Sequence, residues 1–130
     1  MTNDIESGPS IVACAAGRTP GGELNFTFPE VLGAIKICTS NNIAVLGIDV
    51  FEVRADGYLT KRLAAYSYDR ETQQGLDDKL QEQGWPGYVR ASNELAERFM
   101  GEYPAGDDHV YVLTTSSWRE FCEVQRMKRQ

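Results

Sequence analysis

Few residues of this chain combine the type and the spacing that chemistry requires. The one histidine, His109, stands at the start of a predicted strand, and nothing near it in sequence suggests a catalytic triad. Asp77, Asp78 and Glu82 supply oxygen ligands but lack the spacing and the glycine of a calcium loop. No glycine-rich phosphate-binding loop occurs in the sequence. The sequence therefore predicts no catalytic residue, no metal site and no cofactor.

Asp49 has the most unusual setting of the acidic residues, because it lies in the apolar run IAVLGIDVFEV. A buried carboxylate is costly unless it is paired or hydrogen-bonded. We interpret it first as a structural residue that bonds to the backbone or to a base such as Arg62. The alternative is a functional acid in a pocket between sheet and helices, shared with Arg62, Tyr66, Tyr68 or His109. That alternative predicts a small cytosolic enzyme or ligand-binding domain.

Length and composition favour a single domain in a reducing compartment. At 130 residues the chain is long enough to bury a core without disulfides or metal. Its three cysteines, Cys14, Cys38 and Cys122, lack the spacing of metal ligands, which favours buried thiols. No run approaches the roughly 18 apolar residues of a membrane helix, and the first ten residues lack the basic region of a secretory signal. We therefore expect a cytoplasmic protein without a membrane partner.

The negative charge is concentrated in one third of the chain. The net charge is −6, and residues 69–108 hold ten acids and four bases, which alone gives −6. Such a segment would be repelled by nucleic acid and would suit a basic protein partner. The plainer interpretation is a solvated face that keeps the protein soluble. The candidate partner-binding residues are eight of these acids and one tryptophan: Glu71, Asp77, Asp78, Glu82, Trp85, Glu94, Glu97, Asp107 and Asp108.

A β-hairpin is predicted at the centre of the chain. Residues 43–53 are apolar on both faces, as in an interior strand, and residues 58–68 form a second extended run. Asp56-Gly57 lies between them, and an Asp-Gly pair in this position is the strongest short-range hairpin signal. The sequence HVYVLTT at residues 109–115 predicts a further strand.

Two capping boxes predict where helices begin. Thr27 and Glu30 have the required spacing at the start of a helix that we expect to end near residues 40–42. Ser117 and Glu120 repeat this spacing before a last helix, whose basic end suits the helix dipole.

The segment between the hairpin and the last strand divides into a polar connection and a helix. Residues 69–84 are acidic, and two leucines four residues apart predict one or two helical turns and little more. We interpret this connection as a functional loop. Trp85 either anchors that loop against the core or forms an exposed interface hot spot. Residues 88–100 have helical periodicity, which places Asn93 on the outward face with the charged residues.

These elements predict an α+β fold in one domain. The expected sheet is antiparallel, with three to four strands around the central hairpin, and two to three helices pack on it. The domain spans residues 27–130 and follows an N-terminal arm, residues 1–26, with room for a short strand.

Three stretches and their order are typical of a known family. They are LGIDVFEV before the Asp-Gly hairpin, YVRASNELA at residues 88–96, and HVYVL at residues 109–113. In these features the chain resembles small bacterial immunity proteins, specifically the immunity protein 40 family. The resemblance covers about residues 28–113, and the chain departs from it in its N-terminal arm and in the segment after the last strand.

The resemblance implies a stoichiometric inhibitor without catalysis of its own. Proteins of this kind are encoded beside polymorphic toxins, and each binds and occludes a cognate toxin. Many such toxins are basic nucleases, and an acidic inhibitor would gain association rate from the opposed potential. On this basis we expect residues 69–82, the outer face of the helix at 88–100, and Asp107-Asp108 to form an acidic interface, with Trp85 as its aromatic anchor.

Overall fold

Three long strands form most of an antiparallel sheet in the computed structural model, which describes residues 17–18, 24–53, 59–102 and 109–128. Across these residues the sheet has the strand order β1-β2-β5-β3-β4, and three helices accompany it, which confirms the predicted single-domain α+β fold. In chain order the elements are β1 (Gly17–Arg18), β2 (Leu24–Phe26), α2 (Phe28–Ser40), β3 (Ala44–Val53), β4 (Leu59–Tyr66), α3 (Arg70–Glu102), β5 (His109–Ser116) and α4 (Trp118–Lys128).

β3 is the interior strand that its two apolar faces predict. It pairs antiparallel with β4 on one side and with β5 on the other. The pairing with β4 confirms the predicted hairpin, although its turn, Asp56-Gly57, lies outside the described residues. β4 ends at Tyr66, two residues before the predicted end. At the other edge β2 adds to β5, so that part of the segment 1–26 belongs to the sheet.

Both predicted capping boxes are present. At the start of α2 the backbone N–H of Thr27 donates to Glu30 Oε2 at 3.2 Å. At the start of α4 the N–H of Ser117 donates to Glu120 Oε1, and the N–H of Glu120 donates to Ser117 Oγ, both at 3.1 Å. These bonds satisfy backbone groups that have no partner inside the helix. α2 ends where expected, because Asn42 takes a left-handed conformation with φ of 57°.

The loop predicted before Gly84 is wrong, because these residues open the long helix α3. The backbone N–H of Thr72 donates to Asp69 Oδ1 at 2.7 Å, an N-cap interaction that lowers the pKa of the Asp69 carboxyl. α3 breaks at Gly84, whose φ of 72° and ψ of −170° are open to glycine and strained for other residues. We call residues 70–83 the α3 arm and residues 85–102 the α3 body.

Tertiary packing explains why such a polar segment is helical. Leu76 is buried and Leu80 is half-buried, and both pack in the second core cluster with Trp85 and Tyr88 of the α3 body. Two leucines four residues apart share one helix face. A stripe this narrow would not hold an isolated peptide in a helix, but an apolar surface beside it stabilises the arm.

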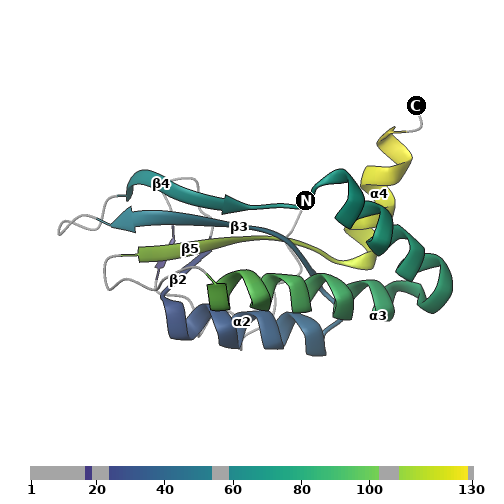
Figure 1. Ribbon diagram of the computed structural model, residues 1–130, viewed down its shortest axis with the longest axis horizontal. Helices are drawn as coiled ribbons and strands as arrows, with labels where there is room; N and C mark the ends of the chain where they lie inside the picture. The colour runs from purple at the N-terminus through teal and green to yellow at the C-terminus, as the bar shows by residue number, and fades with distance from the viewer. Residues whose placement is uncertain (1–16, 19–23, 54–58, 103–108, 129–130) are drawn as a thin grey trace.

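α2 and the α3 body lie side by side along one face of the sheet (Figure 1). Their buried side chains meet those of β3 and β5 in the first core cluster, which includes Val31, Ile35, Val50, Met100 and Tyr111. The α3 arm and α4 lie beyond this layer, at the end of the sheet where β5 ends (Figure 1). This end of the molecule carries the candidate site.

Candidate functional site

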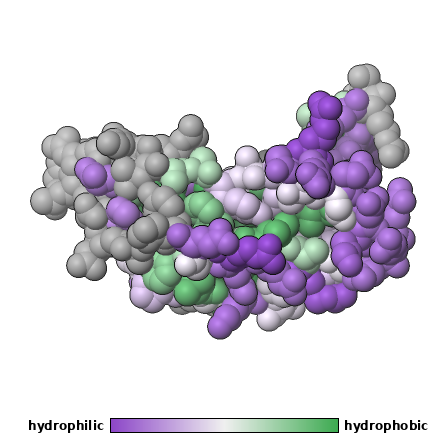
Figure 2. All heavy atoms as spheres, viewed as in Figure 1, coloured by the Kyte–Doolittle hydropathy of each residue, from purple (hydrophilic) through white to green (hydrophobic). Residues whose placement is uncertain are grey.

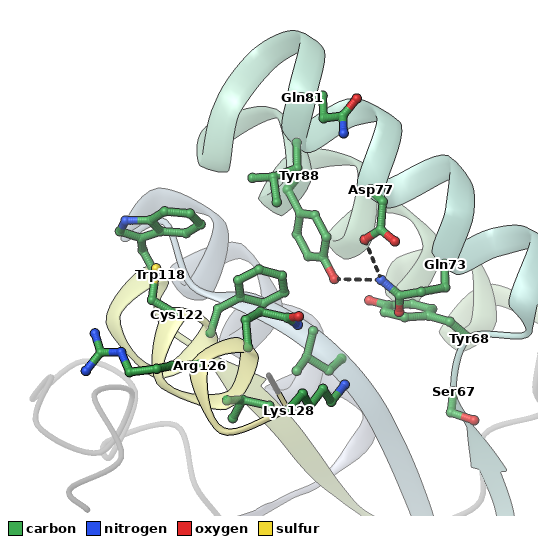
Figure 3. Close-up of a pocket in the computed structure, with 15 residues that line it drawn as sticks. Ser67, Tyr68, Gln73, Asp77, Gln81, Tyr88, Trp118, Cys122, Arg126 and Lys128 are labelled. Carbon is green, nitrogen blue, oxygen red and sulfur yellow. Dashed lines mark hydrogen bonds between the residues drawn. The ribbon is translucent and has the colours of Figure 1, made fainter. Parts of the chain in front are cut away.

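A groove of about 980 Å³ lies between the α3 arm and α4 (Figure 3). Gln73 and Asp77 line it from the arm, Trp118 and Arg126 line it from α4, and Leu46 lines it from β3. Hydrophilic residues dominate the surface of the molecule at this end (Figure 2). The groove therefore combines an apolar floor with polar rims that come from two different helices.

A bulge in β3 directs Leu46 into this groove. In the register with β5, Val45 and Gly47 face consecutive residues, so that Leu46 has no partner of its own. Val45 belongs to the first core cluster, whereas Leu46 packs against the second. Gly47 is required after the bulge, because a Cβ on it would lie 3.0 Å from the carbonyl oxygen of Tyr66.

Four aromatic rings at the groove connect α4 to the α3 body. Trp85 stacks on Tyr88 with ring centroids 5.0 Å apart, and Phe121 of α4 lies 5.2 Å from Trp85 and 5.4 Å from Tyr88. Trp118 lies 5.4 Å from Trp85 and remains 48% exposed. These ring contacts attach α4 to the α3 body.

Trp85 itself belongs to the core. Its side chain is 8% exposed, and its indole N–H donates to the carbonyl oxygen of Asn42 at 2.7 Å. Of the two roles predicted for this tryptophan, the core anchor is the one that this burial supports. Because so little of the ring is accessible, we leave Trp85 out of the interface proposed below.

Two side-chain hydroxyl groups hold the start of β3. One belongs to Tyr68, which follows β4, and the other belongs to Ser92 of α3. The Tyr68 hydroxyl donates to the Val45 carbonyl oxygen at 2.6 Å, and the Ser92 hydroxyl donates to the same oxygen at 2.8 Å. The two hydroxyl groups also contact each other. Burial raises the pKa of Tyr68 well above its ordinary value, which keeps this phenol neutral. Although Tyr68 lines the groove, its hydroxyl is therefore engaged with the backbone.

Asn93 completes this attachment, and its predicted outward orientation is wrong. It is 2% exposed, and its Oδ1 accepts from the Val45 N–H at 2.7 Å. Its Nδ2 donates to the Ile43 carbonyl oxygen at 3.0 Å and to Thr39 Oγ1 at 2.8 Å. A polar side chain is expected on the outward face of a helix. Asn93 can be buried because three hydrogen-bond partners satisfy its amide oxygen and nitrogen. Sequence reasoning missed this residue because its partners lie some 50 residues away.

Asp77 and Asp78 of the α3 arm each accept a hydrogen bond from a glutamine four residues earlier, but they have different surroundings. Gln73 Nε2 donates to Asp77 Oδ1 at 3.0 Å and to the Tyr88 hydroxyl at 3.4 Å, inside the groove (Figure 3). Burial raises the pKa of Tyr88, and the carboxylate of Asp77 adds to this. Gln74 Nε2 donates to Asp78 Oδ1 at 3.1 Å on the exposed surface, away from the groove lining. The pair Asp77 and Asp78 thus offers a matched comparison of groove and outer surface.

The remaining predicted interface residues lie on α3 with different exposure. Glu71, Asp78, Glu82 and Glu94 are exposed, whereas Asp77 and Glu97 are half-buried. Asp107 and Asp108 lie outside the described residues. The structure therefore brings most of the predicted acids onto one helix, divided between its arm and its body.

Three of the exposed acids form a straight stripe along the α3 arm. Positions 71, 78 and 82 are seven and eleven residues apart, and at 3.6 residues per turn they lie within about 40° of one another. Leu76 and Leu80 lie on the opposite side, against the core. We call Glu71, Asp78 and Glu82 the acidic stripe. It spans about 16 Å of helix, as expected from the rise per residue.

The residues of the alternative pocket near Asp49 do not gather in the groove. Asp49 is half-buried, and because Ile48 and Val50 belong to the cluster under α2, Asp49 lies on the opposite face of the sheet. Tyr66 stacks on Phe99 with centroids 5.2 Å apart, within the helix-covered layer, and burial raises its pKa to about 12. The side chain of Arg62 lies outside the described residues, as does Cys14. Of the proposed pocket residues, Tyr68 alone appears in the lining of the groove.

The other two cysteines differ in their surroundings. Cys38 is buried in the first core cluster, and burial raises the pKa of its thiol to about 12, which confirms the predicted buried thiol at this position. Cys122 is half-buried and lines the groove.

The described residues contain neither a metal-binding cluster nor a membrane-spanning helix. Across them, no group of three or more histidine, cysteine or acidic side chains is placed to hold a metal ion. Nor does any helix in this part of the chain have the length and apolarity to cross a bilayer.

Comparison with family models, with curated protein sequences and with solved structures finds no match for this chain. A function must therefore be argued from the residues and their geometry.

Proposed function

We propose that this protein is a non-catalytic immunity protein that binds a cognate bacterial toxin and occludes it. The class of protein comes from the resemblance of two stretches to immunity proteins: LGIDVFEV in β3 and YVRASNELA, residues 88–96, in the α3 body. The acidic stripe supplies the surface. The proposed partner is a protein with a basic surface, such as a nuclease toxin.

The acidic stripe is the observation that carries this proposal. Glu71, Asp78 and Glu82 are exposed and lie along one line, opposite the leucines that attach the arm to the core. Residues 69–84, all of them described, hold five acids and two bases, a net charge of −3. A row of carboxylates with this spacing matches a basic ridge on a partner better than scattered surface charge does.

A helical arm is better suited to this role than the loop that the sequence predicts. The capped and packed arm fixes the backbone positions of its acids before binding, so that less backbone entropy is lost when a partner binds. Opposed charges on two proteins accelerate their encounter, and the gain falls as salt screens them. We therefore expect fast, salt-dependent association with the toxin.

Glu94 and Glu97 are the predicted interface acids of the α3 body, where the charge is mixed because Arg90 and Arg98 are exposed four residues before and after Glu94. Glu94 is exposed and Glu97 is half-buried, which makes Glu94 the stronger candidate for contact. Both acids lie on the α3 body, which packs along the sheet face through its inner side.

The test is co-expression with the product of the gene directly upstream, followed by purification of the complex and calorimetric titration at two salt concentrations. The variant Glu71→Lys/Asp78→Lys/Glu82→Lys should lower the association rate about tenfold or more and abolish protection from the toxin. Raising the salt concentration should weaken the wild-type complex and have less effect on the variant.

A matched pair of single variants separates the stripe from net charge. Glu82→Lys and Glu102→Lys change the net charge equally at exposed positions of the same helix, but Glu102 lies at the far end from the arm. Glu82→Lys should slow association several-fold, whereas Glu102→Lys should have little effect. Equal effects of the two variants, or an intact complex with the triple variant, would refute the acidic stripe as the interface.

A further inference from the structure

Of the three helices in the described residues, α4 is the least buried. None of its residues is fully buried, whereas α2 buries four residues and α3 buries nine. The large hydrophobic side chains that are exposed among the described residues all lie on it: Trp118 at 48%, Val124 at 44% and Met127 at 69%. Figure 1 shows α4 projecting away from the sheet beyond the end of β5. Elements with few buried apolar contacts are the ones that open most easily in a native protein.

The ring contacts that attach α4 come from its first four residues. Trp118 lies 5.4 Å from Trp85, and Phe121 lies 5.2 Å from Trp85 and 5.4 Å from Tyr88. Within the described structure, Phe121 is also the one residue of α4 that packs against either core cluster. The attachment of the whole helix therefore depends chiefly on this phenylalanine.

The helical form of α4 depends on its attachment. The Ser117–Glu120 capping box specifies where the helix begins, and the N–H of Phe121 donates its first helical bond to the Ser117 carbonyl oxygen at 2.9 Å. The helix has 11 residues, and isolated helices shorter than about 12–15 residues are marginal in water. When α4 leaves the α3 body, its helical hydrogen bonds should therefore open together.

The rest of the domain keeps its core when α4 leaves. The buried residues of the first cluster come from the sheet, α2 and the α3 body, and those of the second come from β3 and α3. Trp85 also keeps its bond to the Asn42 carbonyl oxygen, which involves no residue of α4. Release of α4 thus removes no buried side chain from either cluster.

We propose that α4 is a latch, which undocks and unfolds as one unit while the sheet, α2 and α3 remain folded. In the docked state this end of the molecule carries the groove, because α4 forms one of its walls (Figure 3). In the released state the groove no longer exists, and the rings of Trp85 and Tyr88 lose their contacts with Phe121 and become more accessible. The latch thus determines which of two surfaces this end presents, and it is independent of the acidic stripe, which lies on the α3 arm.

Native-state hydrogen exchange of the purified full chain, followed by NMR at increasing urea concentrations below the unfolding transition, tests this proposal. The amides of residues 121–128 should share one protection factor, about a hundredfold or more below that of the most protected amides of β3. Exchange in α4 should depend little on urea, whereas exchange in β3 should depend on it strongly, because global unfolding exposes far more surface.

A substitution in the core separates release of the latch from global unfolding. Ile35 is fully buried on α2, away from α4, and Ile35→Val should accelerate exchange of the most protected β3 amides about twofold to tenfold. The α4 amides should keep their wild-type protection in this variant, because their opening leaves the first core cluster intact.

A second pair of variants tests the attachment itself. Phe121→Ala should lower the protection of the α4 amides about tenfold or more, while the β3 amides stay protected. Met127→Ala is the matched control, because it also shortens an apolar side chain of α4 but at a position that is 69% exposed. It should change the protection of the α4 amides by no more than about twofold.

Four results would each overturn the proposal. The first is an α4 whose amides are as protected as those of β3. The second is a protection factor that falls step by step toward Lys128, since the helix would then fray from its end instead of opening as a unit. The third is an Ile35→Val variant that accelerates exchange in α4 as much as in β3. The fourth is an equal effect of Phe121→Ala and Met127→Ala on α4.

Discussion

Substitution of Asn93 by leucine tests how strongly this one amide stabilises the fold. Leucine has the same branched skeleton of four heavy atoms but bulkier methyl groups, so that Asn93→Leu removes hydrogen bonds without opening a cavity and adds some crowding. In the wild type the amide binds the Val45 N–H, the Ile43 carbonyl oxygen and Thr39 Oγ1 at 2.7 to 3.0 Å. These partners join the start of β3 and the end of α2 to the α3 body.

The cost follows from the groups that lose their partner. The Val45 N–H and the Ile43 carbonyl would be left buried without Asn93, and each unsatisfied buried group costs about 1–3 kcal/mol. Thr39 keeps its bond to the Ile35 carbonyl oxygen at 3.0 Å and adds little. The better helix propensity of leucine offsets about 0.5 kcal/mol. The expected loss is about 2–5 kcal/mol, a large fraction of the 5–15 kcal/mol typical of a domain.

Urea unfolding followed by circular dichroism measures this loss, with Glu94→Leu as the control on the exposed face of the same turn. The control should stay within about 0.5 kcal/mol of the wild type. Ser92→Ala is an informative second comparison, because the Val45 carbonyl oxygen keeps the Tyr68 hydroxyl at 2.6 Å. It should cost only about 1 kcal/mol. An Asn93→Leu protein as stable as the control would refute the reasoning.

Two further substitutions test the break in α3 and the attachment of its body. Gly84→Ala should cost about 1–3 kcal/mol of unfolding free energy, because φ of 72° with ψ of −170° strains a residue with a Cβ. Gly75→Ala is its control, since nothing lies within 4 Å of the added Cβ, and it should gain about 0.5–1 kcal/mol. Trp85→Phe keeps an aromatic ring on Tyr88 but loses the 2.7 Å bond to the Asn42 carbonyl oxygen, and thermal unfolding should show a loss of about 1–3 kcal/mol. Equal stabilities for Gly84→Ala and Gly75→Ala would remove the strain argument, and an unchanged Trp85→Phe protein would remove the hydrogen bond as a contributor.

The parts of the fold that sequence predicts well are those whose signals are local. The capping pairs Thr27 with Glu30 and Ser117 with Glu120 lie within one helical turn of each other, and the structure contains both. The interior position of β3 follows from apolar residues on both of its faces. Pattern and geometry agree at these places because each element is specified by its own residues.

The parts that sequence does not predict depend on distant partners. The α3 arm has too few apolar residues for its own pattern to indicate a helix, and it forms because the α3 body covers Leu76 and Leu80. Asn93 was expected outside because asparagine is polar, yet its partners on β3 and α2 lie far away in sequence. The groove needs the bulge at Leu46, for which Gly47 is the one local signal, since an isolated glycine inside a strand is typical of a bulge. The acidic residues of the arm, by contrast, could be identified from sequence. Sequence does not show that Asp77 lines the groove whereas Glu71, Asp78 and Glu82 lie outside it.

The clamp at the start of β3 links stability to the groove. Asn93, Ser92 and Tyr68 all bind the backbone of Val45, the residue directly before the bulge that turns Leu46 toward the groove. A folded Asn93→Leu protein would therefore hold Leu46, and with it the β3 side of the groove, less firmly. The acidic stripe lies on the outer side of the arm and does not depend on that backbone. Loss of these hydrogen bonds should thus disturb the groove more than it weakens toxin binding through the acidic stripe, because the groove is built on β3 and the stripe is not.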